Sequence, residues 1–225
     1  MNNLIIAIDG HAGCGKSTTA KSVAKKLGYT FIDTGAMYRA TTLWFMENNI
    51  DLSDEKAVAT ALTKIKLRFE FNAEKGFAEM ILNGENVENQ IRSMEVSNKV
   101  SEVSALRTVR TFLVEQQQEM GKKGGIVMDG RDIGTVVFPN ADLKVFMTAS
   151  IETRARRRQL ELASKGKDVD LQSIIDNLGQ RDEIDSSRKE SPLKKAEDAI
   201  EIDTSDMTIK GQIEKVIALA KTKGA

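Results

Sequence analysis

The chain has 225 residues and balances 33 Lys and Arg against 33 Asp and Glu, so its formal net charge is zero. A neutral chain has no general basic field, which excludes binding to nucleic acid or to an anionic membrane through overall charge. Its longest apolar runs, such as LIIAI at 4–8, are too short to span a bilayer, and the N-terminus lacks the regions of a signal peptide, so we expect a cytoplasmic protein.

The single cysteine, Cys14, and the single histidine, His11, predict neither an internal disulfide nor a structural metal site. The length suits one domain that carries inserted subdomains. Because the chain has no net charge, any anionic ligand must be bound by a local motif.

The N-terminal part of the chain alternates strands and helices. LIIAIDG at 4–10 predicts a short buried strand, 16–28 predicts a helix that ends at a glycine, and YTFID at 29–33 predicts a second strand. Either Asp33 or Thr34 is placed to cap the helix that follows. This alternation favours an α/β fold, in which a parallel sheet has helices on both faces and ligands bind at the C-terminal ends of its strands.

The middle of the chain departs from this alternation. KLRFEF at 66–71 and FAEMIL at 77–82 are typical of half-buried antiparallel strands, and Asn83-Gly84 after the second is a strong turn signal. Residues 62–92 are therefore predicted to form a small β insert.

The C-terminal half supplies the remaining core strands and two helical regions. Helical patterns cover 94–122, and a closing amphipathic helix is predicted over 207–222. Three further strands are predicted, at 125–129, 143–148 and 199–203. Together with the first two, they predict a five-stranded parallel sheet. The strongly charged segment between 150 and 198 is predicted to form mobile helices outside this core.

GHAGCGKS, Gly10–Ser17, matches the phosphate-loop pattern G-x-x-x-x-G-K-[ST]. It follows a predicted buried strand and opens a predicted helix, so backbone N–H groups and the helix N-terminus can surround phosphate oxygens. Lys16 is expected to neutralise the charge of the phosphates, and the Ser17 hydroxyl is expected to bind Mg²⁺. This placement favours a nucleotide site over a glycine-rich turn with a capping serine. The residues expected to contact ATP are Gly10, His11, Ala12, Gly13, Cys14, Gly15, Lys16, Ser17 and Thr18.

The loop predicts that a nucleoside triphosphate is bound, but not what is done with it. A GTPase would need an N-K-x-D motif, which the sequence lacks, and a motor ATPase would need a longer chain. A small-molecule kinase is the class that remains, and it needs a second anion site for its acceptor.

DTGAMYR at 33–39 is the first candidate for that second site. Thr34 and Gly35 follow the second predicted strand, and Arg39 lies about one turn into the next helix. A hydroxyl, a backbone N–H and a guanidinium can together hold a phosphate. The alternative is an ordinary helix cap beside a solvated arginine.

VMDGRDIGTVVFP at 127–139 is the second candidate. Here a buried strand leads directly into Asp129, Arg131 and Asp132, after which the sequence becomes apolar again. These three charged residues form either a solvated turn or a binding site for an anionic, polar ligand at the end of the strand.

The motifs IDGHAGCGKST, DTGAMYR and MDGRDIGTVVFP, in this order and spacing, resemble those of the bacterial cytidylate kinases. The similarity continues through SEVSALRTVR, TRARRRQ and QRDEIDSSR, so it covers nearly the whole chain. Other nucleoside monophosphate kinases share the phosphate loop, but neither the DGRDIGTVVFP signature nor the β insert. The resemblance implies a single phosphate-loop kinase domain, with a core at 1–45, 93–150 and 199–225, a monophosphate-binding insert at 46–92 and a mobile helical lid at 151–198.

The resemblance also implies a role for each acceptor-side residue. Arg39 and Arg131 would hold the acceptor phosphate, and Asp185 and Arg188 would contact the sugar. The cytosine edge would be read by Ser101, Arg110 and Asp132. A carboxylate can accept from the exocyclic amine of cytosine, and an arginine can donate to its N3 and O2 atoms. Without the resemblance, Ser101 and Arg110 are typical of polar positions on amphipathic helices.

Two residues of the charged turn have less specific assignments. Gly130 would leave room for the nucleotide to approach the backbone. Asp129 would either orient Arg131 or hold a water on Mg²⁺, and both alternatives remain open at this stage.

Arg154, Arg157 and Arg158 lie at i, i+3 and i+4, which places them on one helical face. The resemblance implies that this helix belongs to the lid, whose arginines, together with Arg181, would stabilise the charge of the phosphoryl group during transfer. A solvated face or a nuclear localisation patch is the alternative interpretation of RARRR.

The implied reaction is ATP plus CMP giving ADP plus CDP, with dCMP as a second acceptor, Mg²⁺ as cofactor, and a monomer as the assembly state. Two alternatives stay open: a phosphate-loop kinase of another small acceptor, such as UMP or shikimate, and a non-catalytic ATP-dependent switch. The chain departs from the common family pattern at His11-Ala12, where Pro-Ser is usual, and at Ser17, where glycine is usual. Thr18 is therefore a second candidate for the Mg²⁺ ligand.

Overall fold

The computed structural model describes residues 3–74, 77–164 and 166–225, and the contacts within the chain define two compact units. The first unit comprises Met1–Ile32 and Gly121–Ala225, and the second comprises Asp33–Met120. The elements of the first unit are β1 (Ile5–Gly10), α1 (Lys16–Leu27), β2 (Thr30–Asp33), β6 (Ile126–Gly130), η2 (Ile133–Val137), β7 (Leu143–Thr148), α6 (Ile151–Ala163), α7 (Leu171–Ser187), β8 (Ile200–Asp203) and α8 (Ile209–Thr222). Those of the second unit are α2 (Thr34–Glu47), α3 (Glu55–Leu62), β3 (Leu67–Asn72), β4 (Phe77–Leu82), β5 (Glu85–Asn86), η1 (Gln90–Arg92), α4 (Met94–Ala105) and α5 (Arg107–Gly121).

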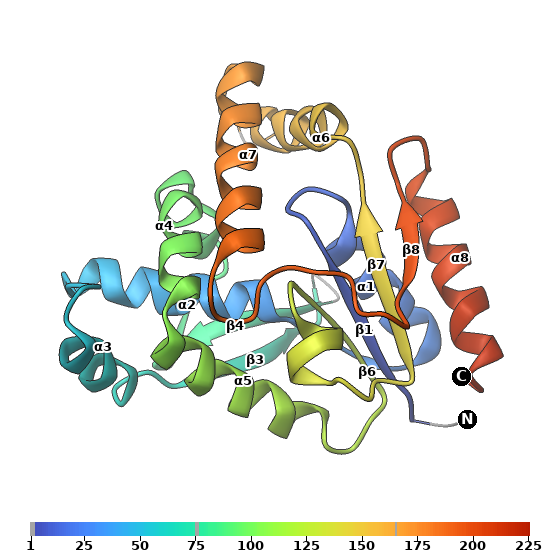
Figure 1. Ribbon diagram of the computed structural model, residues 1–225, viewed down its shortest axis with the longest axis horizontal. Helices are drawn as coiled ribbons and strands as arrows, with labels where there is room; N and C mark the ends of the chain where they lie inside the picture. Colours follow the sequence, from blue (N-terminus) through green and yellow to red (C-terminus); the bar gives the residue numbers. More distant parts are fainter. Residues whose placement is uncertain (1–2, 75–76, 165) are drawn as a thin grey trace. The chain divides into compact units, whose positions relative to one another are not determined.

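The first unit is built on a five-stranded sheet in the order β2-β6-β1-β7-β8, which confirms the predicted parallel sheet (Figure 1). β1 pairs in parallel with β6 on one side and with β7 on the other, and β7 pairs in parallel with β8. All five residues of β6 are buried, as expected for a parallel strand whose side chains have no solvated face. The central position of β1 places the loop that follows it in the middle of the C-terminal edge of the sheet.

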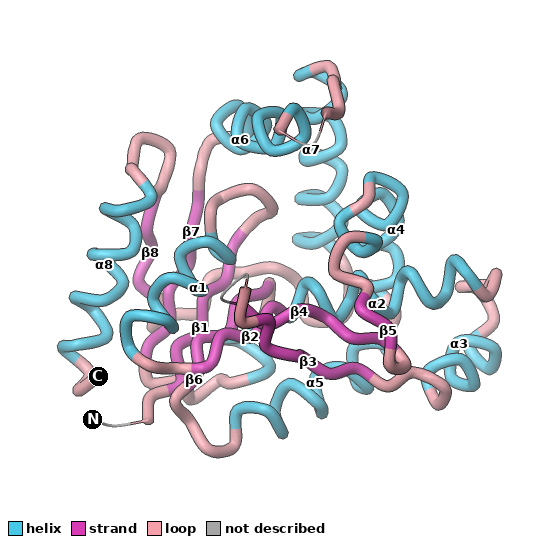
Figure 2. Tube along the Cα trace, turned by 180° about the vertical axis from the view of Figure 1, so that it is seen from behind, coloured by secondary structure: helices cyan, strands magenta, loops and turns pink. Residues whose placement is uncertain are grey.

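Helices α1 and α8 pack on this sheet and against each other (Figure 2). Ala20 and Val23 of α1 join Val216 and Ala220 of α8 in one apolar cluster with the strand residues. The predicted stop of α1 is confirmed, because Gly28 has a φ of 70° and its N–H donates to a carbonyl in the last turn. This helix is therefore fixed along its length, with its N-terminus at the phosphate loop.

The second unit has its own apolar core and its own sheet. Residues from α2, β4, η1 and α5 pack together, with Met37, Met80, Ile91 and Leu113 all fully buried. The small sheet has the order β3-β4-β5 and is antiparallel, which confirms the two predicted strands of the β insert. The tight turn between β4 and β5 is the predicted Asn-Gly turn, with positive φ at both of its residues.

The two open alternatives for the start of α2 are resolved in favour of Asp33. Its carboxylate accepts a hydrogen bond from the Ala36 N–H at 2.8 Å, and the helix begins at Thr34. Asp33 lies at the end of β2, so the strand passes directly into the helix.

Several elements differ in detail from the sequence expectations. The helical patterns over 94–122 form two helices, separated at Leu106, whose backbone is extended. The helix α3, capped by Asp54, and the π-helical turn η2 were not predicted. The predicted division into core, insert and lid stays a prediction. The contacts within the chain define two units instead, and they group α2, α4 and α5 with the small sheet.

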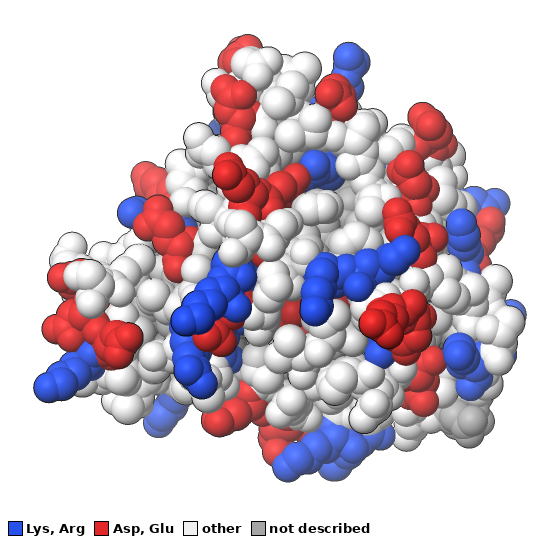
Figure 3. Space-filling view, viewed as in Figure 1, with Lys and Arg blue, Asp and Glu red and all other residues white. Residues whose placement is uncertain are grey.

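The face of the molecule displayed in Figure 3 carries both signs of charge. Figure 3 shows Lys and Arg side chains interspersed with Asp and Glu on the face it displays. Within the described part of the chain, no helix is at once long enough and apolar enough to pass through a bilayer.

Candidate active site

The phosphate loop connects β1 to α1, and its glycines are required by its backbone. Gly10 has a φ of 146°, and a Cβ at this position would overlap the carbonyl oxygen of Met147 on the adjacent strand β7. Gly15, with a φ of 94°, is the N-cap residue of α1 and leaves the first N–H groups of the helix without a capping side chain. The loop therefore presents bare backbone donors at a helix N-terminus, which is the arrangement that binds phosphate.

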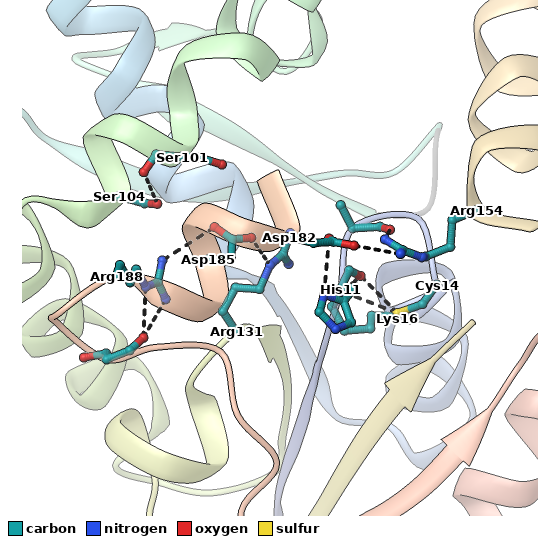
Figure 4. Close-up of polar contacts among 12 residues, drawn as sticks. His11, Cys14, Lys16, Ser101, Ser104, Arg131, Arg154, Asp182, Asp185 and Arg188 are labelled. Atoms are coloured by element: carbon teal, nitrogen blue, oxygen red, sulfur yellow. Dashed lines mark hydrogen bonds and ion pairs between the residues drawn. The ribbon is translucent and has the colours of Figure 1, made fainter. Parts of the chain in front are cut away.

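Lys16 is buried and turns back over this loop (Figure 4). Its Nζ atom donates to the His11 carbonyl at 2.6 Å and lies 3.6 Å from the Cys14 sulfur. Burial lowers the pKa of Lys16, and the nearby Arg131 guanidinium lowers it further. Phosphate oxygens would add negative charge beside this buried ammonium group.

Ser17 and Asp129 form the best candidate for holding Mg²⁺. The Ser17 hydroxyl donates to Asp129 Oδ2 at 2.7 Å, and Asp129 sits next to Ile8 of β1 in the sheet register. A hydroxyl and a carboxylate oxygen beside a triphosphate site are ligands that suit Mg²⁺, which prefers oxygen and keeps several waters. Of the two alternatives for Asp129, this contact favours the role at the metal over the role of orienting Arg131.

Asp9 is a buried carboxylate beside the site that the sequence interpretation did not single out. Its buried carboxylate accepts hydrogen bonds from the N–H groups of Ile133 at 2.8 Å and Gly134 at 2.7 Å. These amides directly follow Arg131 and Asp132, so Asp9 fixes the end of the charged turn to the central strand. The available signal was a lone acidic residue inside the apolar strand 4–10.

The pKa of Asp9 gives a testable dependence of stability on pH. Burial raises this pKa from 3.8 to about 7, despite the two backbone hydrogen bonds. Between these values the folded chain binds more protons at Asp9 than the unfolded chain does. The contribution of Asp9 to the free energy of unfolding therefore falls as pH rises through this window, by at most about 1.4 kcal/mol per pH unit, and is constant above it.

The variant Asp9→Asn removes this titration. We expect the difference in unfolding free energy between the wild type and Asp9→Asn to fall steadily from pH 4.5 to pH 7 and to be flat above pH 8, measured by urea unfolding. A difference that rises with pH over this range would contradict a raised pKa at Asp9.

Arg131, Asp185 and Arg188 form a chain of ionic contacts within the first unit (Figure 4). Arg131 Nε donates to Asp185 Oδ2 at 2.7 Å, and Arg188 NH1 lies 3.8 Å from Asp185 Oδ1. Burial alone would raise the pKa of Asp185, but the charges of Arg131 and Arg188 outweigh it and lower the pKa. Arg188 also donates twice to the Ser191 carbonyl, at 2.9 and 2.8 Å. The structure thus brings together Arg131, one of the two residues expected at the acceptor phosphate, and the two residues expected at the sugar.

Asp132 and Gly130 lie on either side of Arg131, close to the phosphate-loop strand. Gly130 pairs with Asp9 in the sheet register, and Asp132 is buried at the start of η2. The charged sequence at 129–132 is therefore not a solvated turn, because its charges are buried or ion-paired.

The three arginines of α6 that the sequence analysis singled out contact different parts of the first unit. Arg154 reaches the phosphate loop, donating to the Ala12 carbonyl at 3.2 Å, and pairs with Asp182 of α7 at 2.7 Å. Arg157 donates to the Thr204 carbonyl at 2.6 Å, and Arg158 pairs with Glu161 of its own helix at 2.8 Å.

Two residues of α7, Arg181 and Asp182, lie near the arginines described above. Burial, and after it the charge of Arg131, lower the pKa of Arg181 to about 10. Asp182, which the sequence interpretation missed, lies 3.2 Å from His11 Nδ1 as well as beside Arg154, so it connects both helices to the phosphate loop. The segment RDEID contains several carboxylates, and the sequence alone does not indicate which of them contacts His11 and Arg154.

The second unit contains the remaining residues that were predicted for the acceptor: Thr34, Gly35, Arg39, Ser101 and Arg110. Thr34 and Gly35 form the first turn of α2, and Arg39 NH2 lies 3.6 Å from Asp33 Oδ2. Ser101 of α4 and Arg110 of α5 are both buried.

Arg110 is held in place by two contacts. Its NH1 group donates to the Ser104 carbonyl at 3.0 Å, and its guanidinium carbon lies 5.3 Å from the centre of the Tyr38 ring. The Ser104 hydroxyl in turn donates to the carbonyl of Ser101. Arg110 and Ser101 are therefore buried, and Arg110 lies on an aromatic ring. The sequence alone would instead favour solvated positions on amphipathic helices for both residues.

The family model for cytidylate kinase matches residues 6–222 of the chain. Curated cytidylate kinases of Flavobacterium johnsoniae and Bacteroides fragilis are 55% and 53% identical to it, and each alignment covers 97% of this chain and 96% of the relative. A solved structure of an uncharacterised protein from Eubacterium ventriosum aligns with a TM-score of 0.52 and 12% identity over 98% of this chain and 99% of its own, which supports the fold alone. The family match and the curated relatives both extend over nearly the full length, and on this evidence the chain belongs to the cytidylate kinase family.

Proposed function

We propose that this chain transfers the γ-phosphoryl group of ATP to CMP and dCMP, with Mg²⁺ as cofactor. The observation that carries the proposal is the pairing of β1 with β6, which places Asp129, Arg131 and Asp132 next to the strand that leads into the phosphate loop. The Ser17–Asp129 contact at 2.7 Å ties the two segments together. These contacts support the proposal, because the residues proposed for the triphosphate lie beside Asp129, Arg131 and Asp132, which are proposed for the metal and the acceptor.

The reaction needs alignment and charge neutralisation rather than a general base. The CMP phosphate is already an anion at neutral pH, so one of its oxygens attacks the γ phosphorus in line, and ADP leaves. Mg²⁺, held by Ser17 with Asp129 beside it, would supply charge neutralisation on the phosphates when bound. Lys16 and Arg154 would bind the phosphate groups of ATP from the loop and from α6.

The acceptor is oriented by the remaining residues. Arg131 and Arg39 would bind its phosphate, and Asp185 and Arg188 would contact its sugar. Asp132 would accept from the cytosine amine, while Arg110 and Ser101 would satisfy the other polar atoms of the base. A base without that amine would leave the Asp132 carboxylate buried and unpaired, which disfavours it.

The mobile lid would contribute by excluding water and adding charge. Arg157, Arg158 and Arg181 would join Arg154 at the group in transfer, where they would stabilise a loose, strongly negative transition state. Exclusion of water would prevent the hydrolysis of ATP in the absence of an acceptor.

A coupled ADP-release assay against CMP, dCMP, UMP, AMP and shikimate tests the proposal. We expect kcat/KM to be highest for CMP and dCMP, and ADP release without an acceptor to be very slow. Faster turnover with UMP or AMP than with CMP would reject the substrate assignment. ATP binding without turnover on any acceptor would favour the non-catalytic switch.

A further inference from the structure

Thr204 is a fully buried residue that joins the phosphate loop to the C-terminal part of the chain. It directly follows β8, so it lies at the same edge of the parallel sheet as the loop that follows β1 (Figure 1). Its hydroxyl donates to the carbonyl of Cys14, 190 residues earlier in the chain, at 2.9 Å. Cys14 is itself fully buried, so this hydrogen bond is shielded from water.

The Thr204 hydroxyl has one hydrogen and two carbonyl groups within reach. The Thr148 carbonyl lies at the same distance, 2.9 Å, but it already accepts from the Thr204 N–H at 2.8 Å. A buried carbonyl that is left without its hydrogen bond is costly, which favours donation of the hydroxyl to Cys14. The contact with Cys14 is therefore the one that depends on the side chain of Thr204.

This contact also determines the direction of the next backbone N–H group. A peptide group is planar and trans, so the Cys14 carbonyl and the Gly15 N–H point in opposite directions. Holding the carbonyl toward Thr204 therefore directs the Gly15 N–H away from Thr204. Gly15 is the N-cap residue of α1, where N–H groups are the donors that bind phosphate.

The C-terminal part of the chain reaches the same peptide a second time, through Gln212 of α8. A Cβ at Gly15 would lie 2.9 Å from Gln212 Oε1, and Gln212 is fully buried. Gln212 Oε1 accepts from the Thr19 hydroxyl of α1 at 3.0 Å, and its Nε2 donates to the Met207 carbonyl at 3.2 Å. The segment from Thr204 to Gln212 thus contacts the loop both at a carbonyl and at a bare glycine.

Two other carbonyl groups of the loop are held by charged side chains. Lys16 Nζ donates to the His11 carbonyl, and Arg154 NH1 donates to the Ala12 carbonyl. Both cations are proposed to bind the phosphate groups of ATP, which would compete with the loop for their donors. The Thr204 hydroxyl is neutral, so its contact with the loop does not compete with phosphate binding in this way.

We propose that Thr204 is a positioning residue for ATP: its hydroxyl holds the Cys14–Gly15 peptide so that the Gly15 N–H is directed at the phosphate groups. The inference rests on the proposed function, because it takes the loop as the site of the triphosphate. It gives a role in ATP binding to a residue that is distant from the loop in sequence.

The variant Thr204→Val tests the proposal, because valine has nearly the shape of threonine and lacks only the hydroxyl. We expect Kd and KM for ATP to rise about fivefold to thirtyfold, the range for weakening one hydrogen bond to a charged group, with KM for CMP changed less than about threefold. Kd is measured by calorimetric titration of ATP with Mg²⁺ present. The conservative variant Thr204→Ser keeps the hydroxyl and is expected to bind ATP nearly as tightly as the wild type.

The variant Thr41→Val is the matched control. Thr41 is also fully buried, and its hydroxyl also donates to a backbone carbonyl, that of Met37, at 3.1 Å. It belongs to the second unit, which does not contain the phosphate loop. This variant is expected to leave Kd for ATP unchanged. If it weakens ATP binding as much as Thr204→Val does, the effect is a general loss of stability and the positioning role is rejected.

Thr204 also accepts two hydrogen bonds from Arg157, and a further variant separates this contact from the one to the loop. Arg157 NH1 donates to the Thr204 hydroxyl at 3.2 Å, and NH2 donates to the Thr204 carbonyl at 2.6 Å. If Thr204 acts on the loop, Thr204→Val should weaken ATP binding by a similar factor in the wild type and in Arg157→Met. If the effect disappears in Arg157→Met, Thr204 acts through Arg157 and the proposal is wrong.

The remaining outcomes also decide the question. Unchanged ATP binding in Thr204→Val, or an equal loss in Thr204→Ser, would overturn the role of the hydroxyl. If the valine variant does not fold, as judged by circular dichroism, Thr204→Ala is compared with Thr204→Ser in the same titration.

The titration needs no acceptor, so it separates this inference from the choice of substrate. A wild-type protein that binds ATP but shows no CMP-dependent turnover would reject the proposed function, and the binding data would still decide the role of Thr204. A wild-type protein that does not bind ATP would reject both.

Discussion

Replacing Lys16 by methionine is expected to lower kcat for CMP phosphorylation by at least about 10³-fold. Removal of one preorganised donor from a site of developing charge typically costs about 10²- to 10³-fold, and Lys16 carries a full charge in addition. Its Nζ atom is buried at the loop, 2.6 Å from the His11 carbonyl. The measurement is ADP release at saturating CMP and at a series of ATP concentrations.

Folding should survive this substitution. Burial lowers the pKa of Lys16, which means that the fold bears a cost for holding the charge, and methionine of similar length removes that cost. Lys25→Met, at an exposed position of α1, is the matched control and should retain wild-type kcat. A loss of less than tenfold in Lys16→Met would remove this residue from the group that stabilises transfer.

Replacing Asp132 by alanine is expected to lower kcat/KM for CMP by about 10³-fold while leaving ATP binding intact. A site built to pair with one polar group of its substrate discriminates by about 10⁴- to 10⁵-fold against a substrate that lacks it, and removing the protein partner should cost much of that factor. Because the lost carboxylate is specific for an amine, the preference for CMP over UMP should largely disappear as well. ADP release with each nucleotide and equilibrium binding of ATP are the two measurements.

The backbone of the charged turn should not be disturbed by this change. The Asp132 carbonyl accepts from the Val136 and Val137 N–H groups at 2.9 and 3.2 Å, and alanine keeps both bonds. Asp206→Ala, at an exposed position after β8, serves as the control for loss of a carboxylate. An unchanged rate with CMP in Asp132→Ala would exclude Asp132 from the base site.

The elements of the sheet could be predicted from the sequence because their signals are local. β7 has the predicted bounds, and the predicted glycine stop of α1 and Asn-Gly turn after β4 are present, each determined by residue types at adjacent positions. The phosphate loop was recognisable for the same reason, since its function depends on a short run between one strand and one helix.

The ionic contacts of the site could not be predicted in this way, because they join residues far apart in the chain. Asp9 binds the amides of Ile133 and Gly134, and Asp182 lies beside His11 and Arg154. The sequence contains many carboxylates of similar appearance, and only the packing of the strands and helices decides which of them meets a distant amide or arginine.

The η2 turn escaped prediction for a related reason. The segment after Asp132 is apolar in sequence, yet Ile133–Val137 forms a π-helical turn whose first two N–H groups donate to Asp9. Its β-branched side chains favour extended backbone, and the contact with Asp9, more than 120 residues earlier in the chain, could not be predicted from them.

The central place of β1 in the sheet has a consequence for how the protein folds during synthesis. Residues 5–10 leave the ribosome well before their two neighbours in the sheet, residues 126–130 and 143–148. Until then the strand has no backbone partner, and such non-local parallel pairing is slow and exposes apolar surface. A chain that ends before residue 126 would contain every residue of the phosphate loop and still lack the strands that hold it, so nucleotide binding should emerge only late in synthesis, in a single cooperative step with the closing of the sheet.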